Sequence, residues 1–125
     1  MINSSSQLYI IDNSGGRRVH CIKLLKKSPK KYASIGDLVL VTIKTYRKAI
    51  KKRLINKNSI YLGLIVSTKK KVNRVNGLTL SSLDNNIVLL SKDHSLIGKR
   101  IRGTVFVELR EKGFSRIATV AENVL

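Results

Sequence analysis

The fold is decided by residues 60–90, which read IYLGLIVSTKKKVNRVNGLTLSSLDNNIVLL. Residues 60–66 form an apolar run of the length and composition of one buried strand. The run changes abruptly at Ser67 into a cationic segment that contains Lys69, Lys70 and Lys71. Asn76-Gly77 then supplies the dipeptide that most readily adopts a tight turn, and two further strand-like runs follow, at 78–80 and 87–90. The pattern predicts strand, cationic arm, turn, strand and strand, with positive charge at the rim of a buried sheet.

Further short strands are predicted on both sides of this stretch. Residues 7–11, 19–25 and 38–44 are apolar and β-branched, and turn clusters at 12–16 and 35–37 separate them. Residues 104–113 are predicted to form a short helix that Thr104 caps and Gly113 ends, and a last apolar turn follows at 117–125. We therefore expect one mainly β domain over residues 1–125, a small closed or nearly closed β-barrel with a C-terminal helical segment from about residue 104.

Charge is the strongest compositional signal in the 125 residues. Twenty-five Lys and Arg against seven Asp and Glu give a net charge of +18, which indicates an anionic partner. Aromatic residues make up only 5% of the chain, and Trp is absent, so stacking of single-stranded bases is disfavoured and phosphate contacts to folded nucleic acid are favoured. A membrane surface would need an amphipathic basic helix, whereas the basic stretches here read mainly as strands and loops, so we expect no membrane partner.

The cationic segments differ in how firmly their neighbours should hold them. Arg17 and Arg18 leave the turn 12–16 directly, which gives two guanidiniums a defined direction for phosphate contacts. Residues 26–32 form a basic loop. Residues 46–57 form a basic arm, either a hairpin tip or a helix, because no breaker interrupts Arg47 to Leu54.

The sequence contains no combination of residues that indicates catalysis or a cofactor. The aspartates are scattered among turns, and the neighbours Lys92, Asp93, His94 and Ser95 do not make a triad. The single cysteine, Cys21, lies in an apolar strand and is expected to be a buried structural thiol, and the two histidines lack metal-ligand spacing. We expect a binding protein that is not an enzyme and that needs no cofactor or metal.

Several strings together resemble the large-subunit ribosomal protein L-fourteen family. They are DNSGGRRV at 12–19, CIK at 21–23, KYA at 31–33, IGD at 35–37, GLIV at 63–66, TKK at 68–70, NG at 76–77, NNIVL at 85–89, GKRIRG at 98–103, ELR at 108–110 and VL at 124–125. Ser82 departs from the pattern, because the family usually has an aromatic residue there. The resemblance implies a five-stranded barrel with a basic ribbon, large-subunit rRNA binding at the subunit interface, and the L-three and L-nineteen families as neighbours. It also implies an intersubunit bridge to small-subunit rRNA and, in many systems, a docking face for a silencing factor.

The resemblance and the basic segments together give two sets of predicted site residues. Predicted rRNA-contacting residues are Arg17, Arg18, Lys30, Lys31, Lys44, Arg47, Lys48, Lys51, Lys52, Arg53, Lys69, Lys70, Lys71 and Arg74. Residues predicted for the bridge or silencing-factor face are Lys99, Arg100, Arg102, Arg110 and Arg116.

The alternative function is a stand-alone protein that coats nucleic acid without sequence preference, and the third possible function is that of a cationic membrane-active protein. Since the chain is rich in Lys, Asn and Ile and shows no presequence, a mitochondrially encoded origin is preferred over a plastid or an AT-rich bacterium.

Overall fold

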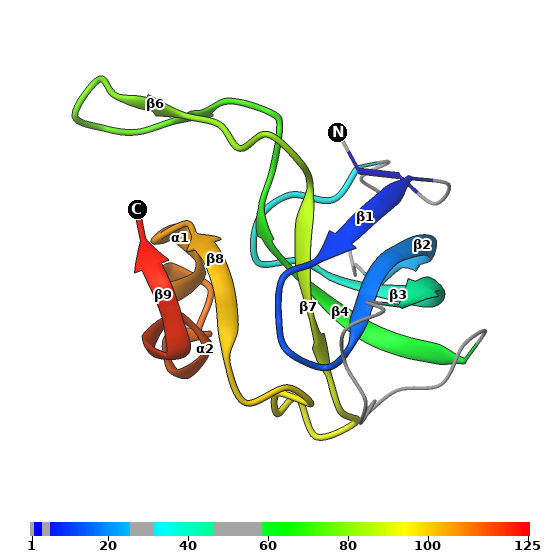
Figure 1. The fold of residues 1–125 in the computed structure, drawn as a ribbon. Helices are drawn as coiled ribbons and strands as arrows, with labels where there is room; N and C mark the ends of the chain where they lie inside the picture. Colours follow the sequence, from blue (N-terminus) through cyan, green and yellow to red (C-terminus); the bar gives the residue numbers. More distant parts are fainter. Residues whose placement is uncertain (1, 4–5, 26–31, 47–58) are drawn as a thin grey trace.

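The computed structural model describes residues 2–3, 6–25, 32–46 and 59–125. A closed five-stranded barrel forms its centre, a two-stranded ribbon projects from one end, and a C-terminal segment packs against the barrel wall (Figure 1). The barrel strands are β1 (Gln7–Ile10), β2 (Gly16–Leu24), β3 (Leu38–Tyr46), β4 (Ile60–Ser67) and β7 (Asn86–Leu90). The prediction of a small five-stranded barrel is therefore confirmed.

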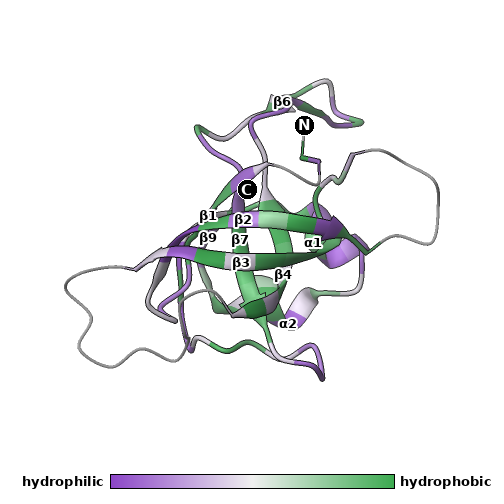
Figure 2. Cartoon of the chain, turned by 90° about the vertical axis from the view of Figure 1, so that its right-hand side faces the viewer, coloured by the Kyte–Doolittle hydropathy of each residue, from purple (hydrophilic) through white to green (hydrophobic). Residues whose placement is uncertain are grey.

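Barrel closure depends on β1, which pairs with β2 on one side and with β7 on the other. The β1–β7 pair is parallel, with Tyr9 opposite Asn86 and Ile10 opposite Ile87, whereas the other barrel pairs are antiparallel. Closure leaves none of these five strands with an unpaired edge. Figure 2 shows that hydrophobic residues predominate along the barrel strands and hydrophilic ones in the loops.

The hydrophobic side chains form two layers, and this explains two kinds of strand sequence. The barrel interior holds alternate residues such as Val19, Cys21, Val39 and Val41, so β2 and β3 alternate between buried and more exposed positions. The second layer lies outside the barrel, between β4 and β7 and the C-terminal segment, and contains Leu64, Val66, Val88, Leu90, Ile101, Val105, Phe106, Leu109 and Ile117. Strands β4 and β7 are therefore buried on both faces and read as continuous apolar runs.

The central stretch folds as the pattern predicts. Strand β4 leads into β5 (Val72–Asn73), a turn follows at 74–77, and β6 (Thr79–Leu80) returns antiparallel to β5 before β7 re-enters the barrel. Gly77 has a φ angle of +84°, which is the positive value that a tight turn requires of its glycine. Figure 1 shows this β5–β6 ribbon extending well beyond the barrel.

The C-terminal prediction needs correction. Thr104 lies in β8 (Ile101–Val105) and does not cap a helix, since α1 covers only Glu108–Glu111 and has Val107 at its N-cap. A second helix, α2 (Ser115–Val120), leads into β9 (Ala121–Val124), which pairs in parallel with β8. The segment from residue 104 is therefore mixed helix and strand. The predicted end of the helix is right, because Gly113 follows the C-cap residue Lys112 of α1 and adopts φ +92°.

Candidate nucleic-acid interface

Asp12 organises the turn between β1 and β2 as a buried carboxylate with a relative exposure of 1%. Its Oδ1 accepts hydrogen bonds from the Ser14 backbone N–H at 3.1 Å and from the Ser14 hydroxyl at 2.5 Å. Its Oδ2 accepts the backbone N–H of Leu89 on β7 at 3.0 Å. One side chain therefore closes the turn that was predicted at 12–16, and it also ties that turn to a distant barrel strand.

Asn13 connects the same turn to the basic loop before β8. Its Oδ1 accepts the backbone N–H groups of Lys99 at 2.7 Å and Arg100 at 3.1 Å, and its own N–H donates to the Arg100 carbonyl at 3.1 Å. A Cβ on Gly98 would lie 2.6 Å from this Oδ1, so the approach requires glycine. The two exposed cations of Lys99 and Arg100 therefore project from a fixed backbone. Sequence reasoning assigned Asn13 only a turn role and did not predict this contact.

Arg17, Arg18 and Lys44 come together at this end of the barrel. The two arginines lie within β2 rather than before it, and the β2–β3 register shifts between Gly16 and Arg18 and again between Arg18 and Val19. These irregularities leave Arg17 and Lys44 without a Cα partner in the ladder, and both side chains are exposed. Register shifts of this kind redirect side chains away from the ordinary strand alternation. The Arg18 N–H donates to Thr45 Oγ1 at 3.1 Å, which fixes the backbone beneath this group.

Lys69, Lys70 and Lys71 lie at the opposite end of β4, where the ribbon leaves the barrel (Figure 1). All three are exposed, and their backbone is held from both sides. The Lys69 N–H donates to Asn85 Oδ1 at 3.0 Å, and the Lys70 carbonyl accepts the Thr68 hydroxyl at 3.1 Å. Ser82 closes the ribbon root, because its N–H donates to the Thr68 carbonyl at 2.8 Å. The predicted rRNA-contacting residues that the structure describes therefore form separate groups at the two barrel ends rather than one rim.

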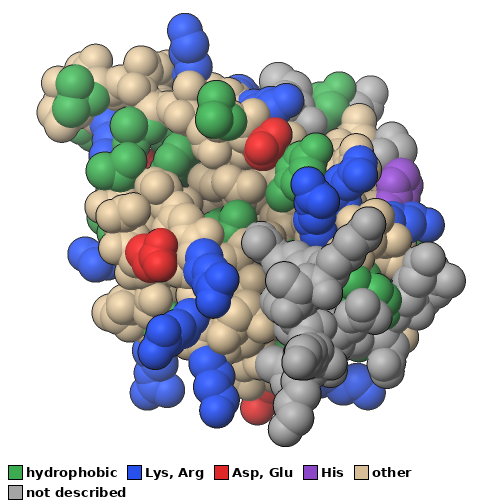
Figure 3. All heavy atoms as spheres, in the orientation of Figure 1, with side chains coloured by type: hydrophobic (Ala, Val, Ile, Leu, Met, Phe, Trp, Pro, Cys, Tyr) green, Lys and Arg blue, Asp and Glu red, His purple; other side chains and the backbone are tan. Residues whose placement is uncertain are grey.

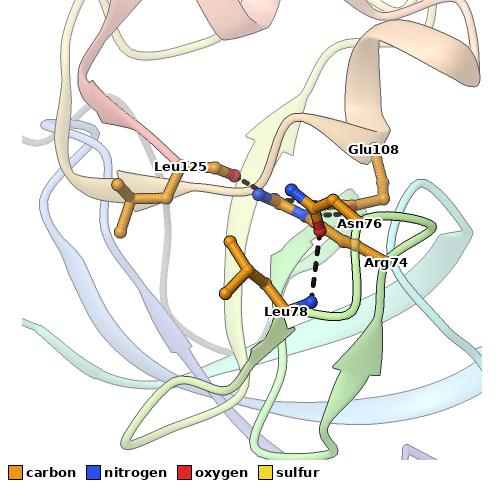
Figure 4. Close-up of polar contacts among 5 residues, drawn as sticks. All are labelled: Arg74, Asn76, Leu78, Glu108 and Leu125. Atoms are coloured by element: carbon orange, nitrogen blue, oxygen red, sulfur yellow. Dashed lines mark hydrogen bonds and ion pairs between the residues drawn. The ribbon is translucent and has the colours of Figure 1, made fainter.

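Arg74 occupies a different place from the lysines before it. Its Nε donates to Glu108 Oε1 at 2.8 Å, its Nη2 donates to Glu108 Oε2 at 3.3 Å, and Nη2 also donates to the Leu125 carbonyl (Figure 4). Burial raises the pKa of Glu108, but the hydrogen bond and charge of Arg74, with a backbone hydrogen bond, outweigh it and leave that pKa below its usual value. Arg74 thus joins the ribbon to the C-terminal segment, and Glu108 pairs across the fold rather than along its helix.

The residues predicted for the bridge face extend from the Asn13-anchored loop into the C-terminal segment. Arg102 is exposed on β8, and its N–H donates to the Ile11 carbonyl at 2.7 Å. Arg110 on α1 and Arg116 on α2 are also exposed. Figure 3 shows Lys and Arg side chains gathered at the lower left of this view, over the region of β8, β9 and α2. The C-terminal segment therefore presents cations on a scaffold that its own apolar layer attaches to the barrel.

The remaining predicted residues lie outside the described part of the chain. They are Lys30, Lys31, Arg47, Lys48, Lys51, Lys52 and Arg53, together with most of the 26–32 loop and the 46–57 arm. Tyr46 is described and ends β3, so the arm begins directly at the end of a barrel strand.

The described residues form cationic groups, and among them we find no cluster of side chains suited to catalysis or metal binding. No group of three or more His, Cys, Asp or Glu suited to a metal ion occurs among them. Asp93 accepts hydrogen bonds from the Ser91 and Ser95 hydroxyls, which lower its pKa, so it closes a turn as expected. Within the same described segments, the helices are too short or too polar to span a bilayer. The arrangement can hold polyanions by charge and hydrogen bonding.

A family model supplies the identity that the fold and the cations indicate. Residues 1–125 match the model described as Ribosomal protein L14p/L23e. Proteins of this family are structural, non-enzymatic constituents of the large ribosomal subunit that bind rRNA and neighbouring ribosomal proteins. The buried carboxylate turn, the anchored basic loop and the ribbon lysines all lie on strings that carry the resemblance. The chain belongs to the ribosomal protein L14p/L23e family.

Proposed function

We propose that this chain is a large-subunit protein that binds large-subunit rRNA at both ends of its barrel. Lys69, Lys70 and Lys71 at the ribbon root contact large-subunit rRNA, and Arg17, Arg18 and Lys44 contact it at the other end. The observation that carries this proposal is that hydrogen bonds fix the backbone beneath each group of cations. Asn85 and Thr68 make these bonds at one end, and Thr45 makes one at the other. A cation on a fixed backbone loses less conformational freedom when it meets a phosphate.

We also propose that Lys99, Arg100, Arg102, Arg110 and Arg116 form the face that meets another macromolecule at the subunit interface. Small-subunit rRNA in an intersubunit bridge is the proposed partner, and a silencing factor is the second where one exists. Proteins of the L-three and L-nineteen families are the proposed neighbours within the large subunit. The Asn13 clamp supports this face because it fixes Lys99 and Arg100 independently of the ribbon. From composition, we propose a mitochondrial ribosome over a plastid or bacterial one, which immunodetection in purified organelles would test.

Charge reversal followed by sedimentation tests the proposed rRNA contact at the ribbon root. The triple variant Lys69→Glu, Lys70→Glu and Lys71→Glu should move from the large-subunit fraction of a sucrose gradient to the top. Lys92→Glu serves as the control, since Lys92 is exposed but belongs to neither predicted set. Binding should also depend strongly on salt: if roughly 6–10 phosphates are neutralised, affinity should fall about 10³–10⁵-fold between 50 and 200 mM salt. A flat salt response, or equal loss in the control, would contradict the assignment.

A second pair of variants separates the proposed faces. Lys99→Glu and Arg100→Glu should remain in large subunits but reduce the yield of joined ribosomes at limiting magnesium. Loss of the variant from large subunits would show that this face binds the subunit's own rRNA instead. Comparable binding to DNA and RNA without co-sedimentation would favour the stand-alone nucleic-acid-coating function.

A further inference from the structure

The turn at the tip of the β5–β6 ribbon contains the one Asn-Gly pair in the 125 residues. Asn76 and Gly77 are both exposed. Arg74 and Leu78 close the loop around them, because the Gly77 N–H donates to the Arg74 carbonyl at 3.0 Å and the Arg74 N–H donates to the Leu78 carbonyl at 2.9 Å. This is the pattern of a three-residue hairpin loop with glycine in its last position. The Asn76 amide is therefore open to water on a short, defined loop.

The side-chain carbonyl of Asn76 is hydrogen-bonded in a way that favours attack on its carbon. Its Oδ1 accepts the Leu78 N–H at 3.2 Å (Figure 4). A donor on a carbonyl oxygen stabilises the negative charge that develops there when a nucleophile adds to the carbon. The next backbone nitrogen along the chain, that of Gly77, is the nucleophile that can close a five-membered ring with this carbon, Cγ.

Gly77 offers that nitrogen with little steric hindrance. It adopts φ +84°, and a Cβ built on it would have no neighbour within 4 Å. Ring closure requires the peptide to rotate toward the side chain, and a residue without a Cβ allows this rotation most easily. The Gly77 N–H must also leave the Arg74 carbonyl. A hydrogen bond in an exposed turn opens readily, because water replaces it.

Two other asparagines show how the features of Asn76 separate. Asn13 has a polarised amide, since its Oδ1 accepts two backbone N–H groups, but the nitrogen that follows it belongs to the buried Ser14 and is already hydrogen-bonded. Asn73 is exposed on the same ribbon, but the residue that follows it is Arg74, which has a side chain and whose N–H is engaged in the loop. Asn76 combines a polarised amide, exposure and a following glycine.

We propose that Asn76 is a site of spontaneous deamidation. The Gly77 nitrogen bonds to Asn76 Cγ, the Cγ–Nδ2 bond breaks, and Nδ2 leaves as ammonia with the proton that the Gly77 nitrogen gives up. The product of this step is a cyclic succinimide. Water then opens the ring: addition at Cγ gives aspartate, whereas addition at the main-chain carbonyl carbon gives isoaspartate. Water is the only other reactant, and no electrons are transferred.

The two products should affect the ribbon differently. Aspartate keeps the backbone path and an oxygen that can accept the Leu78 N–H, so the loop should stay closed. Isoaspartate routes the backbone through the side chain, which lengthens the loop by a carbon atom and displaces the bonds that join Arg74 to Gly77 and Leu78. Because the Arg74 guanidinium links the ribbon to Glu108, the isoaspartate form should hold the ribbon less firmly.

Incubation of the full chain at mildly alkaline pH, in water enriched in the heavy oxygen isotope, tests the site. Trypsin at mildly acidic pH then releases residues 75–92, which carry Asn76, Asn85 and Asn86 in one peptide. Fragmentation by mass spectrometry should place the heavy-oxygen acid at Asn76 and leave the other two amides intact. An Asn76 that keeps its amide, or that loses it no faster than Asn85, overturns the proposal.

A substitution that keeps the turn but removes the amide tests ring formation, because isoaspartate arises through the succinimide. Asn76→Ser retains an oxygen that can accept the Leu78 N–H, and it should abolish methylation of the incubated chain by isoaspartyl methyltransferase. Asn73→Ser, on the same ribbon, is the matched control and should leave methylation unchanged. Undiminished methylation of Asn76→Ser would place the isoaspartate elsewhere and overturn the assignment.

Amide exchange tests the expected loosening of the ribbon. The Arg74 N–H should exchange faster in the purified isoaspartate form than in Asn76→Asp, because only the isoaspartate form alters the backbone path. Equal exchange in the two proteins would show that the loop absorbs the extra carbon atom, which would overturn this part of the inference.

Discussion

Arg74 and Glu108 form a two-pronged ion pair between the projecting ribbon and helix α1, with Nε 2.8 Å from Oε1 and Nη2 3.3 Å from Oε2. The two side chains are largely shielded, at 22% and 20% exposure, and they join segments that also share one hydrophobic layer, since Val72 and Leu80 pack against the cluster that contains Leu109. Since Arg74 also donates to the carbonyl of Leu125, the residue after β9, one guanidinium links the ribbon, helix α1 and the C-terminal residue.

Glu108→Gln should lower the free energy of unfolding by about 1–2 kcal/mol at neutral pH, because it removes a charge-assisted pair that is only partly screened. The pKa of Glu108 is lowered from the ordinary 4.5 in the folded state. Its stabilisation is therefore complete above that ordinary value and disappears as pH falls through the folded value. Denaturant titrations of both proteins from pH 7 to pH 2.5 should converge at the acid end. A constant difference across that range would contradict the pair's role.

Asp12→Ala should cost about 2–4 kcal/mol, because it leaves the buried N–H groups of Ser14 and Leu89 without their acceptor. Chemical denaturation followed by circular dichroism would measure the loss. Asp93→Ala is the matched control, since that carboxylate is exposed and bonds only within its own turn. Equal effects from the two substitutions would show that the link to β7 contributes nothing.

Gly98→Ala should destabilise the fold by about 1–3 kcal/mol, because the new methyl group would lie 2.6 Å from Asn13 Oδ1 and 3.1 Å from the Ser14 backbone nitrogen. Thermal melts would report the change. Asn13→Ala removes the acceptor without a clash, so amide exchange at Lys99 and Arg100 should accelerate while exchange in β3 stays the same. Protection of those two amides in Asn13→Ala would show that the loop is fixed by other contacts.

Cys21 should resist alkylation in the folded protein. Burial inside the barrel raises the pKa of its thiol, and only the thiolate reacts readily. Iodoacetamide at pH 8, followed by mass spectrometry, should leave the native protein unmodified and label it fully in denaturant. Rapid labelling without denaturant would mean that the barrel opens far more often than its closed strand order suggests.

The individual strands of the barrel were predictable because the evidence for each of them is local. The apolar run before Ser67, the Asn76-Gly77 turn and the alternation in β3 each specify an element within about ten residues. The C-terminal segment was predicted wrongly as helical from Thr104, because its helix-compatible residues form a strand once β9 pairs beside them. Propensity is a weak prior that such distant pairing overrides.

The site was predictable in its residue types and less so in its arrangement. Counting lysines and arginines identified the cationic segments, but their separation to opposite barrel ends depends on strand register. Arg74 was grouped with Lys69 to Lys71 because it is close in sequence, whereas Glu108 lies 34 positions away. The hydrogen bond from the Arg100 N–H to Asn13 spans 87 positions, and no periodic pattern in the sequence indicates it.

Barrel closure through β1 and β7 has a consequence for biosynthesis. Asp12 and Leu89, whose backbone N–H donates to the Asp12 carboxylate, are 77 residues apart, and β1 stays open along one edge until β7 has left the ribosomal tunnel. Long-range pairing of this kind forms late, because the intervening chain must first be brought together. The nascent protein therefore exposes an unpaired, aggregation-prone strand edge in a strongly basic chain for most of its translation. If the ribbon lysines bind rRNA as proposed, early binding to newly transcribed rRNA would shorten that exposure and couple folding of this protein to ribosome assembly.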